Sequence, residues 1–239
     1  MSTYKPPSPP MIAARWKGGS QTPTAIVMHG TVSPCESGGA RATAHFFATE
    51  DNKTSAHYVV DPGEVVQCVG DHTIAYHCGY NTGSIGVEMT DPETGPASRW
   101  SDGNHTSMLN HAATLVAELC LAYDIEVRRP TVAELKAKGP HGIYGHNDSR
   151  LAFGSTTHTD PIGFPWPHFL TLVKAEAKRL SQPTEPKAPT KKAPGKPVPA
   201  PVRSPKVQTT LHDAQQIAQP KKRKTLVTFI KGLFKGGAK

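Results

Sequence analysis

Three residues that could bind one metal ion lie far apart in this chain, each beside a short apolar segment. His29 ends the segment Ala-Ile-Val-Met-His, His146 follows Ile-Tyr-Gly, and Asp160 precedes Pro161. Two neutral imidazoles and one carboxylate are a common catalytic zinc set, which leaves a fourth tetrahedral position for a water molecule. Because these residues do not form a short-range motif, only the fold can bring them together.

The apolar pattern predicts elements that could position these residues. Strands are indicated by short apolar or β-branched runs, a hairpin by Asp-Pro-Gly between two such runs, and helices by apolar residues at helical spacing. The expected strands are residues 25–29, 55–60, 64–69 and 84–89, and the expected helices are residues 40–49, 106–123 and 165–180. We therefore predict an α/β fold with a mixed central β-sheet flanked by helices.

Glu88 lies near the end of the strand expected at residues 84–89. Side chains alternate along a strand, so Glu88 shares a face with Ser84 and Gly86, opposite Ile85 and Val87. If that face lines the site, the carboxylate can act as a general base and then as a general acid, which typically contributes about 10²–10⁴-fold to a rate. A glutamate on a solvated strand surface is the alternative.

The composition divides the chain into parts. With 239 residues, 36% of them hydrophobic, the chain can build one ordinary core, but its 23 prolines are too many for one uniform domain. Residues 182–207 are rich in proline and lysine and hold almost no large apolar side chain, so we predict a disordered linker there. We expect residues 1–20 to be an N-terminal extension, residues 21–181 the folded domain and residues 208–239 a basic tail.

The basic tail contributes strongly to the formal net charge of +8, notably through the Lys-Lys-Arg-Lys run at 221–224. Within residues 221–236, apolar side chains follow helical spacing at Leu226, Phe229, Ile230, Leu233 and Phe234. This pattern predicts a short basic amphipathic helix that orders on an anionic membrane or wall polymer. A frayed terminus and a helix folded back onto the domain are the alternatives. Nucleic acid is not an expected partner, because no aromatic residues interleave with the linker lysines.

The cysteines and the N-terminus indicate the compartment. Cys35, Cys68, Cys78 and Cys120 form no CxxC pair, so we expect free thiols in a protein made in a reducing cytoplasm. Residues 1–20 contain four prolines and no continuous apolar run, which is not the pattern of a signal peptide. No segment reaches the roughly 20 apolar residues of a membrane span. A target outside the membrane would therefore require a separate means of delivery.

Ordered sequence blocks extend over roughly residues 20–180. They are Ile26-Val-Met-His29, Ser55-Ala-His-Tyr-Val-Val60, Gln67-Cys-Val69, Ala75-Tyr-His-Cys-Gly79, Ser84-Ile-Gly-Val-Glu88, Gly145-His146 and Thr159-Asp-Pro161 with Phe164-Pro-Trp166. Their content and order resemble the type 2 N-acetylmuramoyl-L-alanine amidases. That family includes bacteriophage endolysins, bacterial anhydromuramyl-peptide amidases and the animal peptidoglycan recognition proteins.

The resemblance implies roles for several residues. His29, His146 and Asp160 match the family's zinc ligands, one zinc ion per chain, and Glu88 matches its Gly-x-Glu segment. His158 stands where many bacterial relatives have a lysine that is thought to stabilise the oxyanion, and an imidazole N–H could do the same. Competition of His158 with Asp160 for the metal is the alternative, which we do not prefer.

Two further matches leave alternatives open. His77 matches a tryptophan-histidine-alanine-glycine element near the substrate, with Tyr76 in place of the tryptophan. It could hydrogen-bond the muropeptide or hold its own loop. Residues 147–157 are interpreted as a loop, slightly longer than the equivalent connection in the bacterial enzymes.

The expected function is zinc-dependent hydrolysis of the amide between N-acetylmuramic acid and L-alanine in peptidoglycan. We expect a monomeric bacteriophage endolysin, made in the host cytoplasm without a signal peptide and acting on the cell wall after release. A non-catalytic peptidoglycan-binding module and a cytoplasmic amidase that recycles anhydromuropeptides are the alternatives. The presence of all three ligand residues and Glu88 favours an enzyme.

Overall fold

A computed structural model describes residues 8–51 and 53–182 of the chain. The Pro/Lys linker from residue 183 onward, the basic tail and its expected helix at 221–236 lie outside the described residues. No helix in the described ranges is long and apolar enough to cross a membrane. The four cysteines, all of which fall in these ranges, are free thiols, as the sequence predicted.

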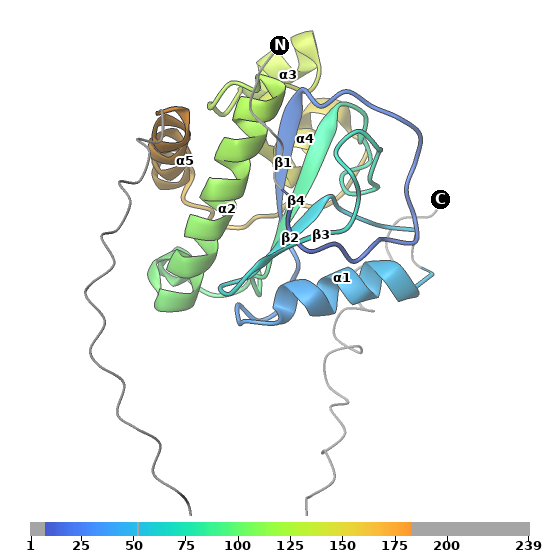
Figure 1. Ribbon diagram of the computed structural model, residues 1–239. Coiled ribbons are helices and arrows are strands. Elements are labelled where there is room, and N and C mark those ends of the chain that lie inside the picture. Colours follow the sequence, from blue (N-terminus) through green and yellow to red (C-terminus); the bar gives the residue numbers. More distant parts are fainter. Residues whose placement is uncertain (1–7, 52, 183–239) are drawn as a thin grey trace, which may run out of the picture. The chain divides into compact units, whose positions relative to one another are not determined.

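A five-stranded sheet lies at the centre, with the strand order β3-β2-β4-β1-β5 (Figure 1). Neighbouring pairs β2–β4, β4–β1 and β1–β5 are parallel, whereas β3 is antiparallel to β2. The sheet is therefore mixed, which confirms the predicted fold class. The strands are β1 (Ala25–Gly30), β2 (Tyr58–Val60), β3 (Val65–Gln67), β4 (Ser84–Met89) and β5 (Gly142–Gly145).

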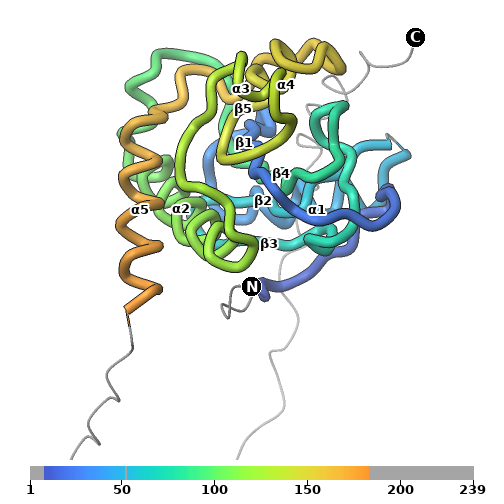
Figure 2. The backbone as a smooth tube through the Cα atoms, turned by 90° about the horizontal axis from the view of Figure 1, so that it is seen from above, coloured from blue at the N-terminus to red at the C-terminus, as the bar shows by residue number. Residues whose placement is uncertain are grey.

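Helices cover both faces of this sheet. Ile26 and Met28 of β1 point to one face, where they pack with α2 (Gly103–Tyr123) and α5 (Trp166–Ser181). Those two helices lie side by side in both views (Figures 1 and 2). On the other face, Phe47 of α1 (Gly39–Thr49) packs against β2 and β3, while Val27 packs with Tyr144 of β5. His29 follows the alternation of Val27 and belongs to this second face.

The hairpin strands are shorter than predicted, mainly at the ends away from the turn, and one carboxylate organises the turn itself. Asp61 Oδ1 accepts hydrogen bonds from Gly63 N (2.6 Å) and Glu64 N (2.8 Å). Asp61 Oδ2 accepts from Gly38 N (2.8 Å) and Ala40 N (2.9 Å) at the start of α1. The fully buried Asp61 thus joins the turn to a helix N-terminus. At the far end of the hairpin, Cys68 N and Val69 N both donate to the His57 carbonyl (2.8 and 3.4 Å), and the regular ladder ends there.

Three short helices had not been predicted: η1 (Ala97–Ser101), α3 (Val132–Lys138) and α4 (His146–Phe153). The interpretation of residues 147–157 as a loop is therefore wrong for residues 147–153. The Asp148 carboxylate accepts from Gly145 N (3.0 Å), which satisfies a free amide at the start of α4. Gly154, with φ of 68°, ends the helix in the left-handed region.

Residues 8–20, part of the expected N-terminal extension, run along the edge of the sheet. Ile12 N and Ala14 N donate to the carbonyls of Gln67 (2.9 Å) and Cys68 (2.8 Å), and the Ala14 side chain is buried. This segment therefore covers the outer side of β3, which would otherwise leave its backbone groups without partners.

Candidate active site

The two histidines of the predicted metal set lie at the carboxyl ends of neighbouring parallel strands. His29 is near the end of β1, and His146 follows β5 directly as the first residue of α4. Asp160 enters from the segment before α5, where Asn147 N donates to its carbonyl oxygen (3.1 Å) and Gly30 N to its Oδ2 (3.2 Å). Backbone groups beside each histidine thus hold the third residue.

Three donor atoms converge at this point. His29 Nδ1 lies 3.0 Å from His146 Nδ1 and 3.2 Å from Asp160 Oδ2, and His146 Nδ1 lies 3.1 Å from Asp160 Oδ1. Tetrahedral zinc bonds of about 2.0–2.1 Å place neighbouring donors about 3.3 Å apart, so the separations fit. Among the described residues this is the only His/Cys/Asp/Glu cluster that could hold a metal ion.

The pKa shifts of His29 and Asp160 also favour binding of a cation. Burial and the neighbouring His146 lower the pKa of His29 to about 4, so its imidazole is neutral at pH 7. Burial alone would raise the pKa of Asp160, but its close contacts with His146 and His29 bring the pKa below its ordinary value. Neutral imidazoles and an ionised carboxylate are the forms that bind metal.

The outer nitrogens of both histidines have partners of their own. His29 Nε2 lies 3.0 Å from His77 Nδ1, and His77 Nε2 lies 3.2 Å from Ser84 Oγ. His146 Nε2 lies 2.9 Å from Thr156 Oγ1. Partners of this kind fix the orientation of a metal-binding imidazole. Both ring nitrogens of His77 therefore face protein groups, which favours a positioning role over direct contact with substrate.

Gly86 makes room for the His77 ring. A Cβ atom at position 86 would lie 2.6 Å from His77 Cγ, closer than real contacts allow. This close approach is the physical reason for a glycine in the Gly-x-Glu segment. The loop that carries His77 is held by the Asn81 side chain, whose Oδ1 accepts from the backbone N–H groups of His77 and Cys78 (2.9 Å each).

A cavity of about 470 Å³ opens above the donor atoms, and Glu88 lines it. Glu88 is the register partner of His29 on the adjacent strand, so both side chains point to the same side of the sheet. Burial raises the pKa of Glu88 well above its usual range, and the nearby carboxylates of Asp160 and Glu93 raise it further. Lys53, Thr54 and Tyr76 also line the cavity.

His158 lines the same cavity and stacks on His146, with ring centroids 5.1 Å apart and planes at 13°. It is half-buried, and burial and the nearby His146 lower its pKa. The converging donor cluster contains Asp160 and not His158. The geometry thus favours Asp160 as the third ligand and leaves His158 beside the space for a substrate.

Sequence reasoning did not single out Thr156 and Ser84. Thr156 lies in the segment interpreted as a loop, and no local signal connects its hydroxyl to His146. Ser84 lies on the face predicted for Glu88, so the alternation could have indicated it.

The fold and the site together define an α/β protein with a His-His-Asp donor cluster in a cavity at the carboxyl ends of parallel strands. The family model for N-acetylmuramoyl-L-alanine amidase matches residues 19–163, more than half of the chain. The chain therefore belongs to the N-acetylmuramoyl-L-alanine amidase family.

Two curated relatives align with part of this chain. A probable N-acetylmuramoyl-L-alanine amidase of Bacillus licheniformis is 32% identical over 120 residues, which are 44% of this chain and 32% of the relative. The amidase CwlL of the same organism is 30% identical over 122 residues, 44% of this chain and 31% of the relative. The matched part of this chain thus spans about a third of each relative.

Two solved structures share the fold. The Staphylococcus aureus hydrolase AmiA, in complex with its ligand, gives a TM-score of 0.54 at 16% identity and covers 72% of this chain and 84% of its own. A mutant form of PlyL gives a TM-score of 0.51 at 18% identity and covers 71% of this chain and 99% of its own. At these identities the likeness concerns the arrangement of the elements and not individual side chains.

Proposed function

We propose that this chain is a zinc-dependent amidase that hydrolyses the bond between N-acetylmuramic acid and L-alanine in peptidoglycan. The observation that carries the proposal is the convergence of His29, His146 and Asp160 beneath a cavity that Glu88 lines, in a member of the amidase family. One bound Zn²⁺ would supply Lewis-acid polarisation of the scissile carbonyl.

The side chains of the cavity have distinct tasks in this proposal. Glu88 takes a proton from the attacking water and passes it to the leaving amide nitrogen. His158, beside His146, donates an N–H to the oxygen that becomes negative in the transition state. His77 orients the His29 ring from behind, since both its nitrogens have protein partners. The cavity holds the junction between sugar and peptide.

The biological role that we propose is lysis of a host cell as a bacteriophage endolysin. It rests on the family membership and on the basic tail seen in the sequence, which would bring the enzyme to anionic membranes or wall polymers. In this role the chain acts as a monomer on the cell wall, with peptidoglycan as its partner.

The test is digestion of purified peptidoglycan with and without a chelator. We expect new L-alanine amino termini without new reducing sugars, loss of activity on chelation and recovery with about one zinc per chain. His146→Ala should remove both metal and activity, whereas the exposed His45→Ala should keep both. New reducing ends would identify a glycosidase, and binding of peptidoglycan without cleavage would identify a recognition module. Cleavage only of soluble anhydromuropeptides would identify a recycling enzyme.

A further inference from the structure

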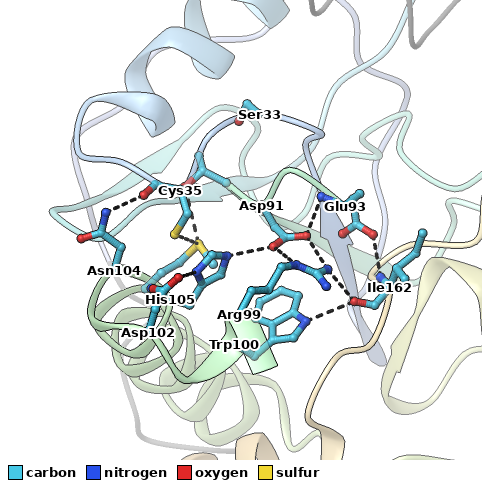
Figure 3. A network of polar contacts seen from close by, with 12 residues as sticks. Ser33, Cys35, Asp91, Glu93, Arg99, Trp100, Asp102, Asn104, His105 and Ile162 are labelled. Carbon is cyan, nitrogen blue, oxygen red and sulfur yellow. Dashed lines mark hydrogen bonds and ion pairs between the residues drawn. The ribbon is translucent and has the colours of Figure 1, made fainter. Parts of the chain in front are cut away.

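The backbone of Ile162, two residues after Asp160, is held on both sides. Its N–H donates to Glu93 Oε2 (2.6 Å), and its carbonyl oxygen accepts from Arg99 Nη2 (2.7 Å) and Trp100 Nε1 (3.1 Å). All three side chains come from the segment between β4 and α2, as Figure 3 shows. We call Glu93, Arg99 and Trp100 the Ile162 clamp.

A buried ion pair holds the clamp itself. The two carboxylate oxygens of Asp91 each accept a hydrogen bond of 2.8 Å from Arg99, through Nε and Nη2. Asp91 also accepts from Glu93 N (2.8 Å) and contacts His105 Nε2 (2.9 Å) (Figure 3). Its side chain is fully buried, and that of Arg99 is 9% exposed. The guanidinium therefore has one fixed place, from which Nη2 reaches Ile162.

Such a pair is a weak source of stability. Removing two charges from water costs about as much as their attraction returns, so well-packed apolar residues often do as well. Geometric precision is the better account of this arrangement, because a planar guanidinium with a bidentate partner directs its remaining N–H groups accurately. Here the remaining N–H group is directed at the Ile162 carbonyl, in the segment that carries Asp160.

One residue of the clamp, Glu93, also contacts the backbone of β1 beside the donor cluster. A Cβ atom at Gly30 would lie 1.8 Å from Glu93 Oε1, so the Glu93 side chain packs directly against the Gly30 backbone. Gly30 N in turn donates to Asp160 Oδ2 (3.2 Å). Glu93 thus contacts the Asp160 segment at Ile162 and also the residue whose amide holds the Asp160 carboxylate.

We propose that Glu93, Arg99 and Trp100 are positioning residues that fix the Asp160 carboxylate against His29 and His146. This inference rests on the proposed function, in which Asp160 is a zinc ligand. Loosening the clamp lets the carboxylate move away from the histidines, so the three donors no longer meet without reorganisation. Changes to groups that orient metal ligands typically weaken metal affinity by about 10–100-fold.

The test is the zinc affinity of the folded full-length chain, measured by competition with a chromophoric chelator. Trp100→Phe removes one N–H and keeps an aromatic ring, and Arg99→Met removes the guanidinium. We expect zinc binding to weaken several-fold in the first variant and at least about tenfold in the second. Trp16→Phe is the matched control, because Trp16 Nε1 has no hydrogen-bond partner among the described residues, and it should bind zinc like the wild type.

Glu93 provides a conservative pair of variants. Glu93→Gln keeps an acceptor for Ile162 N–H and should retain zinc affinity within about threefold, whereas Glu93→Ala should lose at least about tenfold. Circular dichroism and thermal melts of the zinc-free variants establish that they are folded. Variants that melt earlier but bind zinc as tightly as the wild type would overturn the proposal and reduce the clamp to a structural contact. If the wild type neither binds zinc nor cleaves peptidoglycan, both the clamp proposal and the proposed function are overturned.

Discussion

At the scale of single residues, a chain of hydrogen bonds selects the nitrogen with which His29 faces the donor cluster. The Ser84 hydroxyl donates to the Asn81 carbonyl (2.8 Å), so its oxygen accepts from His77 Nε2–H. His77 Nδ1 is then an acceptor and receives the His29 Nε2–H. The remaining lone pair of His29, on Nδ1, points at His146 and Asp160. Burial keeps the pKa of His77 well below its usual value, so this ring stays neutral.

Ser84→Ala tests that chain of hydrogen bonds. Loss of the acceptor for His77 Nε2–H frees the ring to change tautomer, so we expect zinc affinity to fall by about tenfold while the fold is kept. Ser149→Ala is the control, because Ser149 is as deeply buried but lies outside this chain of hydrogen bonds. Equal zinc affinity in both variants, measured by chelator competition, would show that Ser84 does not control the tautomer.

Glu88→Gln separates chemistry from binding. The amide keeps the shape of the carboxylate but cannot accept a proton, so turnover should fall by at least about 10²-fold. Zinc content and peptidoglycan binding should remain unchanged, because Glu88 is not one of the converging donors. The measurement is the rate of amino-terminus release alongside the metal content, and near-normal turnover would move the proton transfer to another group.

At the scale of elements, the structure confirms the predicted central strands and adds short helices that the prediction lacks. β1 and β4 are buried on both faces, and the apolar run of β1 and the alternating apolar residues of β4 are both recognisable in a sequence. α4 begins with polar residues, and its N-terminus depends on the reach of Asp148 back to Gly145. α3 carried a usable signal, since Thr131 and Glu134 have the capping-box spacing and cap each other in the structure.

The same distinction applies to the site. His29, His146, Asp160 and Glu88 could be named because they follow or end recognisable segments. The partners of Thr156, Ser84 and the Ile162 clamp could not be predicted, because they depend on which groups the fold brings together. Thr156 and Ser84 contact histidine side chains, and the clamp contacts backbone groups of a residue far away in the chain. Local patterns carry no information about such distances.

Asp61→Ala tests how one carboxylate joins two elements. The substitution leaves four backbone N–H groups, at the hairpin turn and at the start of α1, without their acceptor. We expect the zinc-free protein to lose about 2–4 kcal/mol in free energy of unfolding, from a lost cap and lost charge-assisted hydrogen bonds. Urea unfolding of this variant, of the milder Asp61→Asn and of the exposed Asp51→Ala provides the comparison. A loss no larger than that of Asp51→Ala would show that the turn and helix do not depend on Asp61.

At the scale of the whole molecule, buried histidines tie stability to pH. His57 Nδ1 accepts from Gly86 N (3.0 Å) and Nε2 lies 2.9 Å from the Thr73 carbonyl, so the neutral ring suits its place. Burial lowers the pKa of His57 to about 4. Between that value and about 6.5, the usual value in an unfolded chain, the unfolded state binds the extra proton. Stability is therefore fully present above pH 6.5 and falls as the pH drops towards 4.

His57→Asn measures this contribution. Asparagine can accept from Gly86 N but does not titrate, so the variant should show a shallower loss of stability between pH 6.5 and 4 in the presence of a chelator. The difference in proton uptake on unfolding between wild type and variant should approach one proton. Over the range from pH 6.5 to 4 this corresponds to about 3 kcal/mol in free energy of unfolding. Urea unfolding at several pH values provides the slopes, with the exposed His45→Asn as control. Identical slopes for His57→Asn and wild type would mean that His57 is protonated in the folded state as readily as in the unfolded one.

Truncation after Gln182 tests the division between domain and tail. It keeps the whole of α5 and removes the Pro/Lys linker and the basic residues. We expect cleavage of soluble muropeptide fragments to remain intact and lysis of whole cells to decrease, more strongly at low salt, where charge attraction is largest. Both activities should be compared with the full chain across ionic strength. Equal lysis at every salt concentration would leave the tail without a part in targeting.

The contact between His77 and Gly86 limits which substitutions this protein can accept. Position 86 has no room for any side chain, and the ring that occupies the space orients His29 in turn. In a library of variants, position 86 would tolerate glycine alone, whereas Ile85 and Val87 on the opposite face could exchange with other apolar residues of similar volume. Laboratory evolution of new substrate specificity would therefore be directed to the rim of the cavity, at positions such as Lys53 and Tyr76, and not to the strand beneath it.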